Sequence, residues 1–418
     1  MESVLEIAKK AKAAAQKLAS YSAGQKNAAL SLLAKLAVEN KAGILEANAA
    51  DVDAARGKIS GAMLERLSLS EKKIASMAEG VGQVAALPDP VGEIMESAER
   101  PNGLRIDKVR VPIGVIGIIY ESRPNVTIDC AALCLKSGNA AILRGGSECF
   151  NTNKVLAALA REALEKSGLD PDCVQMIPTT DRAAFGELLK LDKFVDCIIP
   201  RGGEKLIRLV VENSSIPVIK HYKGVCTVYV DKSADFEMAR EIVLNAKCQR
   251  PSVCNAAENL IVHADVAEKF LPALARSLAE KGVEMRASER AAAVLSKSGV
   301  KFSPASEEDF YTEYVDLIIS ADIVDDVDAA VAFVNKYGSG HSDAIVASDE
   351  AAARKFLDGA DSSSVYWNAS TRFTDGFEFG FGAEIGISTD KLHARGPMGL
   401  RELCSYKYKI YGNGQLRG

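Results

Sequence analysis

Apolar residues recur with a helical period through the N-terminal part of the chain. Residues 1–98 are rich in alanine, and their leucines and valines stand three or four positions apart, as in helices that bury one face. This pattern predicts a helical layer. Between residues 104 and 111 apolar and polar residues alternate one by one, which is typical of a half-exposed strand. Pro112 and Gly114 separate this strand from a wholly apolar run, so we expect an arm that leads into a buried sheet.

Strands and helices then alternate along the chain. The expected elements are strands at 115–119, 140–143, 173–177 and 194–199, helices at about 126–137, 152–167, 182–191 and 204–213, and further strands near 216–230. Such an alternation specifies a parallel sheet with helices on both faces and right-handed crossovers. The sequence therefore predicts a doubly wound α/β domain.

A second α/β unit is expected from residue 235 to residue 362. It begins with an amphipathic helix at 235–247, which follows a break after Asp231. The polar turn QRPSVCNA, a strand and another helix come next. Two parallel-sheet domains are therefore predicted.

The C-terminal part differs from both units. Residues 363–394 contain a stretch rich in glycine and phenylalanine, which predicts a loop-like segment. Residues 404–411 alternate again as a strand. Together with residues 104–111, this strand suggests an arm sheet that another subunit completes.

The composition is that of a folded protein without a membrane span. With 418 residues the chain exceeds one hydrophobic core, and its 48% hydrophobic and 26% charged residues suit a soluble fold. The N-terminal segment lacks the uncharged core of a signal peptide. A net charge of -5 and a single Trp give nucleic-acid binding little support. Nine scattered cysteines, not at disulfide or zinc spacings, suggest free thiols, a cytoplasmic location and no metal site.

Two arginine-glycine-glycine tripeptides each follow an apolar strand and each open a helix. They are Arg144, Gly145 and Gly146, and Arg201, Gly202 and Gly203. At the carboxyl end of a strand, the next helix offers unpaired N–H groups, glycine lets a phosphate approach, and arginine adds charge. Either tripeptide alone is an ordinary turn in the simpler interpretation, but their repetition at equivalent positions favours a dinucleotide site. The GxGxxG fingerprint is absent.

Cys254 is the candidate nucleophile because its setting differs from that of the other cysteines. It lies in a polar turn between a helix and a strand, with Arg250 nearby in sequence. A structural cysteine is the alternative, and Cys248 is the rival thiol. Asn125, which follows Pro124 at a helix start, is either an N-cap or an amide that donates to an oxyanion.

Long segments of the chain resemble the aldehyde dehydrogenase superfamily and, within it, the γ-glutamyl phosphate reductases, also called glutamate-5-semialdehyde dehydrogenases. The segments are VPIGVIGIIYESRPNVT (111–127), NAAILRGGSE (139–148), PRGGEKLI (200–207), QRPSVCNA (249–256), YGSGHSDAIV (337–346), NASTRFTDGFEFGFGAEIGIS (368–388) and HARGPMGL (393–400). The resemblance covers essentially the whole chain. It implies an aldehyde-dehydrogenase-like fold with two doubly wound domains and a β oligomerisation arm.

The resemblance also assigns roles to these domains. It implies a cofactor-binding domain of residues 1–103 and 112–234, a catalytic domain of residues 235–362, an oligomerisation arm of residues 104–111 and 395–418, and a return segment of residues 363–394. The implied reaction is reduction of L-glutamyl 5-phosphate by NADPH to glutamate 5-semialdehyde and phosphate, the second step from glutamate to proline.

Several residues match functional positions of the family. Cys254 matches the nucleophile that expels phosphate and forms a thioester, and Asn125 matches the oxyanion-hole amide. Arg144 and Ser147 fall where relatives contact the adenosine ribose, and this pair would favour the 2′-phosphate of NADPH. Glu313 falls near the position that holds the nicotinamide ribose.

Phosphate and the α-carboxylate of the substrate both require cations. The matching segments supply Arg123, Lys220, Arg250 and Arg395, each of which is otherwise a surface salt-bridge partner. The sequence does not rank them.

The chain departs from the hydrolytic relatives at one position. These relatives carry a glutamate general base, whereas the corresponding stretch KHYKGVCTVYV contains His221 and Tyr222 but no carboxylate. An enzyme that exchanges its thioester with phosphate needs no such base, so a hydrolytic aldehyde dehydrogenase is the less favoured alternative. A non-catalytic scaffold protein is a further alternative. The expected partners are the small-molecule substrate, a homo-oligomer (dimer or tetramer), and transiently glutamate 5-kinase.

Overall fold

The computed structural model describes residues 2–220 and 222–417 and divides into two compact units. Unit 1 comprises residues 1–220, 380–386 and 398–418, and unit 2 comprises residues 221–379 and 387–397. In the described residues, the structure contains no helix with the length and apolar character needed to cross a bilayer.

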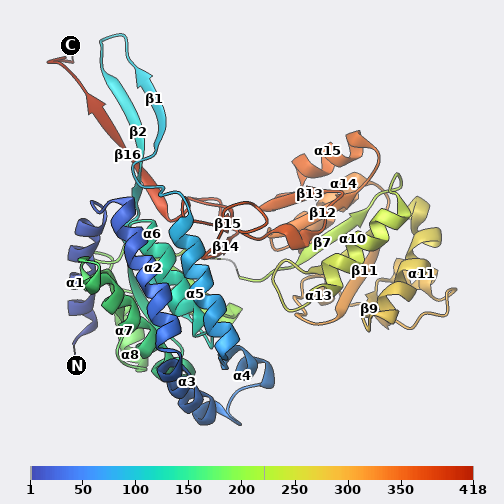
Figure 1. Cartoon of the computed structure of the whole chain (residues 1–418). Coiled ribbons are helices and arrows are strands. Elements are labelled where there is room, and N and C mark those ends of the chain that lie inside the picture. Colours follow the sequence, from blue (N-terminus) through green and yellow to red (C-terminus); the bar gives the residue numbers. More distant parts are fainter. Residues whose placement is uncertain (1, 221, 418) are drawn as a thin grey trace. The chain divides into compact units, whose positions relative to one another are not determined.

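The helical layer of unit 1 lies at the N-terminus. It consists of α1 (Val4–Leu18), α2 (Ala23–Glu39), α3 (Lys41–Ala55), α4 (Gly61–Leu67) and α5 (Glu71–Ala86). A serine precedes α1, α2, α4 and α5, and its hydroxyl accepts a backbone N–H of the first turn, which caps the helix. Helix α1 buries Ile7, Ala8 and Ala11 against the sheet residues Val115 and Ile142. Helix α1 therefore packs on the sheet itself, whereas α2, α3 and α5 pack against the helices formed by Asn125–Lys136 and Phe150–Lys166 (Figure 1).

Unit 1 contains a parallel four-stranded sheet in the order β5-β4-β3-β6. The strands are β3 (Val115–Tyr120), β4 (Ala140–Gly145), β5 (Val174–Met176) and β6 (Cys197–Arg201). Its other elements are α6 (Asn125–Lys136), α7 (Phe150–Lys166), α8 (Arg182–Leu188), α9 (Glu204–Asn213) and the 3-10 turns η1 (Ser147–Cys149) and η2 (Pro171–Cys173). The chain runs outward from β3 to β5 and then returns to place β6 on the other side of β3. This reversal is the point at which doubly wound sheets bind ligands.

Unit 2 contains a parallel seven-stranded sheet in the order β10-β9-β11-β8-β7-β12-β13. Its strands are β7 (Cys226–Val230), β8 (Ala257–His263), β9 (Glu284–Ala287), β10 (Ser303–Pro304), β11 (Ile318–Val324), β12 (Ser342–Val346) and β13 (Ser364–Trp367). Its helices are α10 (Phe236–Cys248), α11 (Ala264–Glu280), α12 (Glu289–Leu295), α13 (Glu307–Phe310), α14 (Val327–Tyr337), α15 (Glu350–Gly359) and the 3-10 turn η3 (Thr371–Phe373). Every residue of β7, β8 and β12 is buried, as expected for central parallel strands.

A three-stranded antiparallel sheet forms an arm that projects from the helices of unit 1 (Figure 1). It consists of β1 (Ile94–Glu99), β2 (Arg105–Pro112) and β16 (Cys404–Tyr411), with β2 in the centre. A small pair, β14 (Gly386–Ser388) and β15 (Gly396–Met398), completes the list of strands. The predicted fold class, α/β with two parallel-sheet domains and a β arm, is confirmed.

Three sequence-based boundaries were wrong. The helical prediction for residues 1–98 missed β1, which pairs with β2 in the arm. The boundary at 234 placed β7 in the first domain, but β7 pairs with β8 and β12 in the sheet of unit 2. The return segment 363–394 is divided, because its residues 380–386 belong to unit 1 and its other residues to unit 2. Periodicity identifies a strand but does not say which sheet it joins.

Candidate functional site

A cavity of about 560 Å³ lies in unit 1 at the carboxyl ends of β3 and β4, between α8 and α9. It is lined by Ile119, Tyr120, Glu121, Arg144, Gly146, Arg182, Phe185, Gly186, Leu189, Lys190, Leu206, Leu209 and Asn213. Apolar side chains supply most of the wall, while Arg144, Arg182 and Lys190 supply positive charge. This is the composition of a pocket that holds an anionic ligand with apolar parts.

Arg144 enters this cavity from the end of β4. Its guanidinium donates to the carbonyl oxygens of Gly145 and, at 3.1 Å, Thr180, and it lies 6.0 Å from the Phe185 ring centroid. Its Nε is buried without a hydrogen-bond partner in the structure. Burial lowers the pKa of Arg144 from its ordinary value. A buried donor without an acceptor is costly, so an anionic ligand would be favoured at this position.

The second tripeptide lies at the start of α9. The Gly203 N–H donates to Glu121 Oε2 at 3.0 Å, and Gly203 is an N-cap without a side-chain acceptor. A Cβ on Gly202 would lie 2.7 Å from the Glu121 carboxyl group, so a larger residue there would require the Glu121 side chain to move. The turn therefore places the N-terminus of a ten-residue helix at the sheet edge, a kind of position at which many proteins bind phosphate.

The residues at this edge fit a dinucleotide. Arg144 and Gly146 line the cavity, and Arg201 and Gly202 lie at the end of the neighbouring β6. Ser147 is exposed, and its hydroxyl lies 3.5 Å from Glu148 Oε2. The cations Arg182 and Lys190 were not among the predicted residues. They lie on and just after α8, which follows the short strand β5, and the sequence there contains no recognisable ligand-binding motif.

Asn125 is the first residue of α6, but its side chain does not cap that helix. Its amide Nδ2 donates to Asp129 Oδ2 at 2.9 Å, one turn further along α6. Burial raises the pKa of Asp129 to about 6, against the opposing hydrogen bond from Asn125. The amide is therefore held in one orientation, and the N-cap interpretation of Asn125 is wrong. Each amide nitrogen carries two hydrogens, and Asp129 takes one of them.

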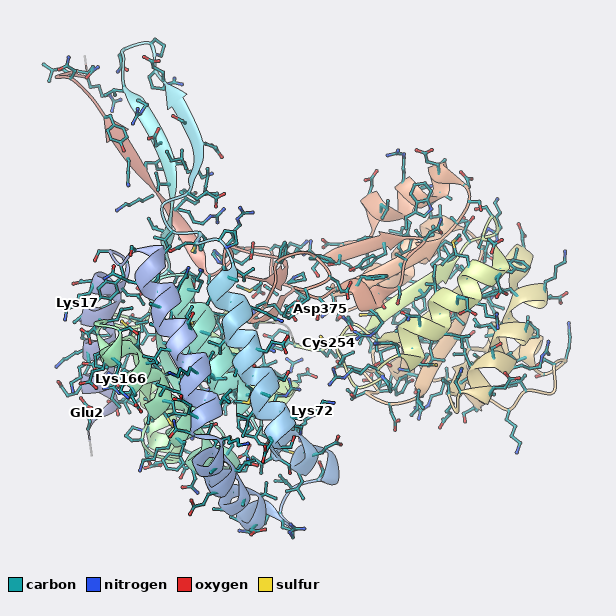
Figure 2. All side chains as sticks on the ribbon, viewed as in Figure 1. Glu2, Lys17, Lys72, Lys166, Cys254 and Asp375 are labelled. Atoms are coloured by element: carbon teal, nitrogen blue, oxygen red, sulfur yellow. The ribbon has the colours of Figure 1, made fainter. Side chains whose placement is uncertain are left out.

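Cys254 lies half-buried on the loop between α10 and β8 of unit 2 (Figure 2). Burial raises the pKa of eight other thiols, to about 12 for several of them, which disfavours their thiolate form. These thiols are Cys130, Cys134, Cys149, Cys173, Cys197, Cys226, Cys248 and Cys404. The rival Cys248 is the last residue of α10.

Gly224 is packed against the backbone of Cys254. A Cβ on Gly224 would lie 1.8 Å from the Cys254 carbonyl oxygen and 2.7 Å from its Cα. The same carbonyl oxygen accepts a hydrogen bond from the Cys226 thiol at 3.3 Å. Gly224 and Cys226 thus fix the position of the Cys254 loop relative to the sheet of unit 2.

A second segment, residues 370–375, is joined to the Cys254 loop by hydrogen bonds. Asn255 Nδ2 donates to the carbonyl oxygens of Thr374 at 2.9 Å and Arg372 at 3.3 Å, and Thr371 Oγ1 donates to the Asn255 carbonyl oxygen at 2.7 Å. Arg372 Nε donates to Gln249 Oε1 at 2.9 Å. Arg372 is therefore beside the nucleophile loop, and the sequence analysis missed it.

A buried ion pair connects the two ends of the Cys254 loop. Lys247 Nζ lies 2.7 Å from Glu258 Oε2, and both side chains are fully buried. Burial raises the pKa of Glu258, Lys247 opposes this, and the charge of Glu313 adds to it. Glu313, the predicted nicotinamide-ribose residue, is thus electrostatically coupled to the base of the loop. Its neighbour Val315 has a φ of 54°, an uncommon conformation for a β-branched residue.

Comparison with known proteins identifies the family. The Aldehyde dehydrogenase family model matches residues 1–301. Gamma-glutamyl phosphate reductase of Opitutus terrae is 58% identical over 98% of this chain and 97% of that protein. The enzyme of the same name from Carboxydothermus hydrogenoformans is 57% identical, with full coverage of both chains. The chain belongs to the γ-glutamyl phosphate reductases of the aldehyde dehydrogenase family.

Solved structures agree with this assignment. The crystal structure of gamma-glutamyl phosphate reductase from Thermotoga maritima is 45% identical, covers both chains completely and has a TM-score of 0.97. An acetylating aldehyde dehydrogenase from Geobacillus thermoglucosidasius, at 17% identity and a TM-score of 0.70, shares the fold. The prediction that the chain is an oxidoreductase of this family is confirmed.

The predicted substrate cations of this reductase have different surroundings. Arg395 is a salt-bridge partner: its guanidinium donates to Asp361 Oδ1 at 2.9 Å, and Lys391 and Arg395 hold the pKa of Asp361 below its usual range. Its assignment as a substrate residue therefore stays a prediction, and the salt bridge to Asp361 is the contact that the structure shows. Arg123 is exposed and Lys220 is half-buried, whereas Arg250 is exposed on the Cys254 loop. His221, part of the stretch that lacks a general base, lies outside the described residues.

Proposed function

We propose that this protein reduces L-glutamyl 5-phosphate to L-glutamate 5-semialdehyde and phosphate with NADPH, through a thioester on Cys254, as the second step of proline biosynthesis from glutamate. The relatives' names supply the substrate. The observation that supports the mechanism best is the position of Cys254, half-buried on a loop fixed by Gly224 and the Lys247–Glu258 pair, with Arg250 on the same loop.

Cys254 acts as the nucleophile in this proposal. Its thiolate adds to the acyl carbon, the bond from that carbon to the phosphate oxygen breaks, and phosphate leaves with the electron pair. After reduction the carbon–sulfur bond breaks, which releases the aldehyde and regenerates the thiolate. The Asn125 amide and the Cys254 backbone N–H donate to the oxyanion of the reacting carbonyl group, and Asp129 keeps the Asn125 amide in the donating orientation.

NADPH supplies the hydride when it is bound. The residues proposed to hold it are Arg144, Gly145, Gly146 and Ser147 after β4, Arg201, Gly202 and Gly203 after β6, and Glu313. The cavity residues Arg182 and Lys190 add charge for its phosphates. The buried, unpartnered Nε of Arg144 supports an anion at this edge.

The experiment that tests the proposal runs the reaction in reverse. Purified protein is given glutamate 5-semialdehyde and NADP, with and without phosphate or arsenate, and NAD is compared with NADP. NADP reduction that requires phosphate or arsenate is expected, because the segment that holds the general base in hydrolytic relatives has no carboxylate. Turnover to glutamate without phosphate would instead identify a hydrolytic aldehyde dehydrogenase. A protein without turnover that nevertheless bound glutamate 5-kinase would support a scaffold.

The arm supports a homo-oligomer. Strand β16 is an edge strand of the arm sheet, and it exposes apolar side chains: Tyr406 is 49%, Tyr408 57% and Ile410 61% exposed. An exposed edge strand with apolar residues pairs readily with another chain. We therefore propose that the arm holds a dimer or tetramer together. Light scattering of an Ile410→Asp variant should give a smaller species than the unchanged protein, and an unchanged mass would exclude this role.

A transient complex with glutamate 5-kinase is also proposed, because acyl phosphates decay in water. A faster coupled reaction with both enzymes present than with the two enzymes separated by a membrane is expected, and equal rates would contradict it.

A further inference from the structure

Two arginine side chains flank Cys254, one on its own loop and one on the segment joined to that loop. Arg250 lies four residues before Cys254. Gln249 directly precedes Arg250, and its Oε1 accepts a hydrogen bond from Arg372 Nε at 2.9 Å. The hydrogen bonds between Asn255 and residues 371, 372 and 374 hold the two segments side by side. The labelled residues Cys254 and Asp375 mark these neighbouring segments in Figure 2.

The charges of the two guanidinium groups are not balanced by nearby ion pairs. Within the described part of the chain, neither Arg250 nor Arg372 lies within ion-pair distance of a carboxylate. Burial lowers the pKa of Arg372, and the neighbouring charge of Arg250 lowers it further, while Cys254 and Asp375 act in the opposite direction. Arg372 is therefore close to both Arg250 and the nucleophile.

Like charges held together are costly unless an anion lies between them. Arg372 uses its Nε for Gln249, which leaves the two terminal nitrogens of the guanidinium for a ligand. A phosphate group suits this arrangement, because guanidinium donors match its oxygens in pairs and remain charged at every physiological pH.

We infer that Arg250 and Arg372 form the phosphate subsite beside Cys254, which receives the phosphoryl group of the acyl phosphate and, in the reverse direction, inorganic phosphate. The inference rests on the proposed function and deepens it, since the sequence left open which cations bind the phosphate and which bind the α-carboxylate. As the carbon–oxygen bond breaks, negative charge grows on the departing phosphate. The two guanidinium groups stabilise this charge, and in reverse they position a phosphate oxygen to attack the thioester carbon while the thiolate leaves.

The test compares Arg372→Gln and Arg250→Gln with the unchanged protein in the phosphate-dependent reaction. Each variant is expected to raise the KM for phosphate by about tenfold or more, since a charge-assisted hydrogen bond is lost. The KM for the semialdehyde and for NADP should stay unchanged. Arg372→Lys, which keeps the charge but not the paired donors, should give a smaller increase.

A second readout does not depend on turnover. Iodoacetamide alkylates Cys254, and inorganic phosphate bound beside the thiol should slow this alkylation in a saturable way. The phosphate concentration that halves the rate should rise by about tenfold in Arg372→Gln. Alkylation of Cys248 in the same sample is the internal reference and should not respond to phosphate.

Two control variants separate binding from structure. Arg354 on α15 is ion-paired with Glu350 on the surface of unit 2, so Arg354→Gln removes the same charge without changing the phosphate dependence. Gln249→Ala removes the partner of Arg372 Nε but keeps the guanidinium, so its phosphate KM should rise less than that of Arg372→Gln.

The outcomes distinguish this inference from the proposed function. If the unchanged protein turns over without phosphate, the proposed function fails, and the subsite fails with it. If the unchanged protein needs phosphate but Arg372→Gln has the same phosphate KM and the same protection of Cys254, only the subsite is overturned. A loss of kcat with an unchanged phosphate KM and unchanged protection of Cys254 would likewise overturn the subsite, because Arg372 would then not bind inorganic phosphate.

Discussion

Gly224→Ala tests how closely the position of Cys254 is controlled. The added Cβ would lie 1.8 Å from the Cys254 carbonyl oxygen, whereas real Cβ contacts are essentially never under 3.0 Å. Both contacting groups are backbone, so no side chain can turn away. The loop must therefore move by about 1.2 Å, and a displacement of this size costs about 10²-fold in rate when it misplaces a reacting atom.

The assay measures kcat in the phosphate-dependent reaction together with the rate at which iodoacetamide alkylates Cys254. We expect kcat of Gly224→Ala to fall by about 10²-fold, with a loss of about 1–3 kcal/mol in the free energy of unfolding. Binding of NADPH, measured by the fluorescence of its reduced nicotinamide, should not change.

The matched control is Gly82→Ala, an exposed position inside α5 where a Cβ meets nothing within 4 Å. This control should keep full activity and gain about 0.5–1 kcal/mol of stability. A folded Gly224→Ala protein with the kcat of the control would refute the conclusion that Gly224 sets the position of the nucleophile.

Three further predictions concern buried groups. Lys247→Met leaves the Glu258 carboxylate buried without its partner and should lower the free energy of unfolding in urea by about 3–5 kcal/mol. Adding Glu258→Gln should recover part of this loss. A loss below about 1 kcal/mol for Lys247→Met would contradict a buried ion pair. Burial raises the Asp129 pKa from 3.8 to about 6, so the folded state holds this proton more tightly than the unfolded chain. The Asp129 contribution to stability is therefore present below the unfolded pKa and is lost as pH rises through about 6. Asp129→Asn should flatten the plot of unfolding free energy against pH between these two pKa values. An unchanged plot would exclude the pKa shift. Arg144→Gln should raise the KM for NADPH more than the KM for NADH. Equal increases would exclude a contact between Arg144 and the 2′-phosphate of NADPH.

The sequence predicted the parallel sheets well because their strands are continuous apolar runs between amphipathic helices. It placed β7 in the wrong unit, since the pairing of a strand depends on contacts with β8 and β12 far along the chain. It missed β1 because that strand is exposed along its whole length and has no apolar face that a pattern would reveal.

The candidate site was predicted where local motifs carry the signal. The tripeptide after β4 and Cys254 are of this kind, because a glycine-rich turn or a polar loop can be recognised from neighbouring residues alone. Arg372 and Asp129 were missed since their importance comes from what they contact: Arg372 from Gln249 across more than a hundred residues, and Asp129 from the orientation of the Asn125 amide. The salt bridge of Arg395 could not be predicted from the sequence either, because its partner Asp361 lies in a different sequence segment.

The most direct measurement is the location of the acyl group on the protein. Protein incubated with L-glutamyl 5-phosphate in the absence of NADPH is quenched in acid, digested and analysed by mass spectrometry. Because Pro251 follows Arg250, trypsin leaves Cys248 and Cys254 in one peptide, so fragment ions must place the modification. We predict a glutamyl group on Cys254 that disappears when NADPH is added. A glutamyl group on Cys248 or on any other residue, or turnover without an acylated cysteine, would contradict the thioester mechanism.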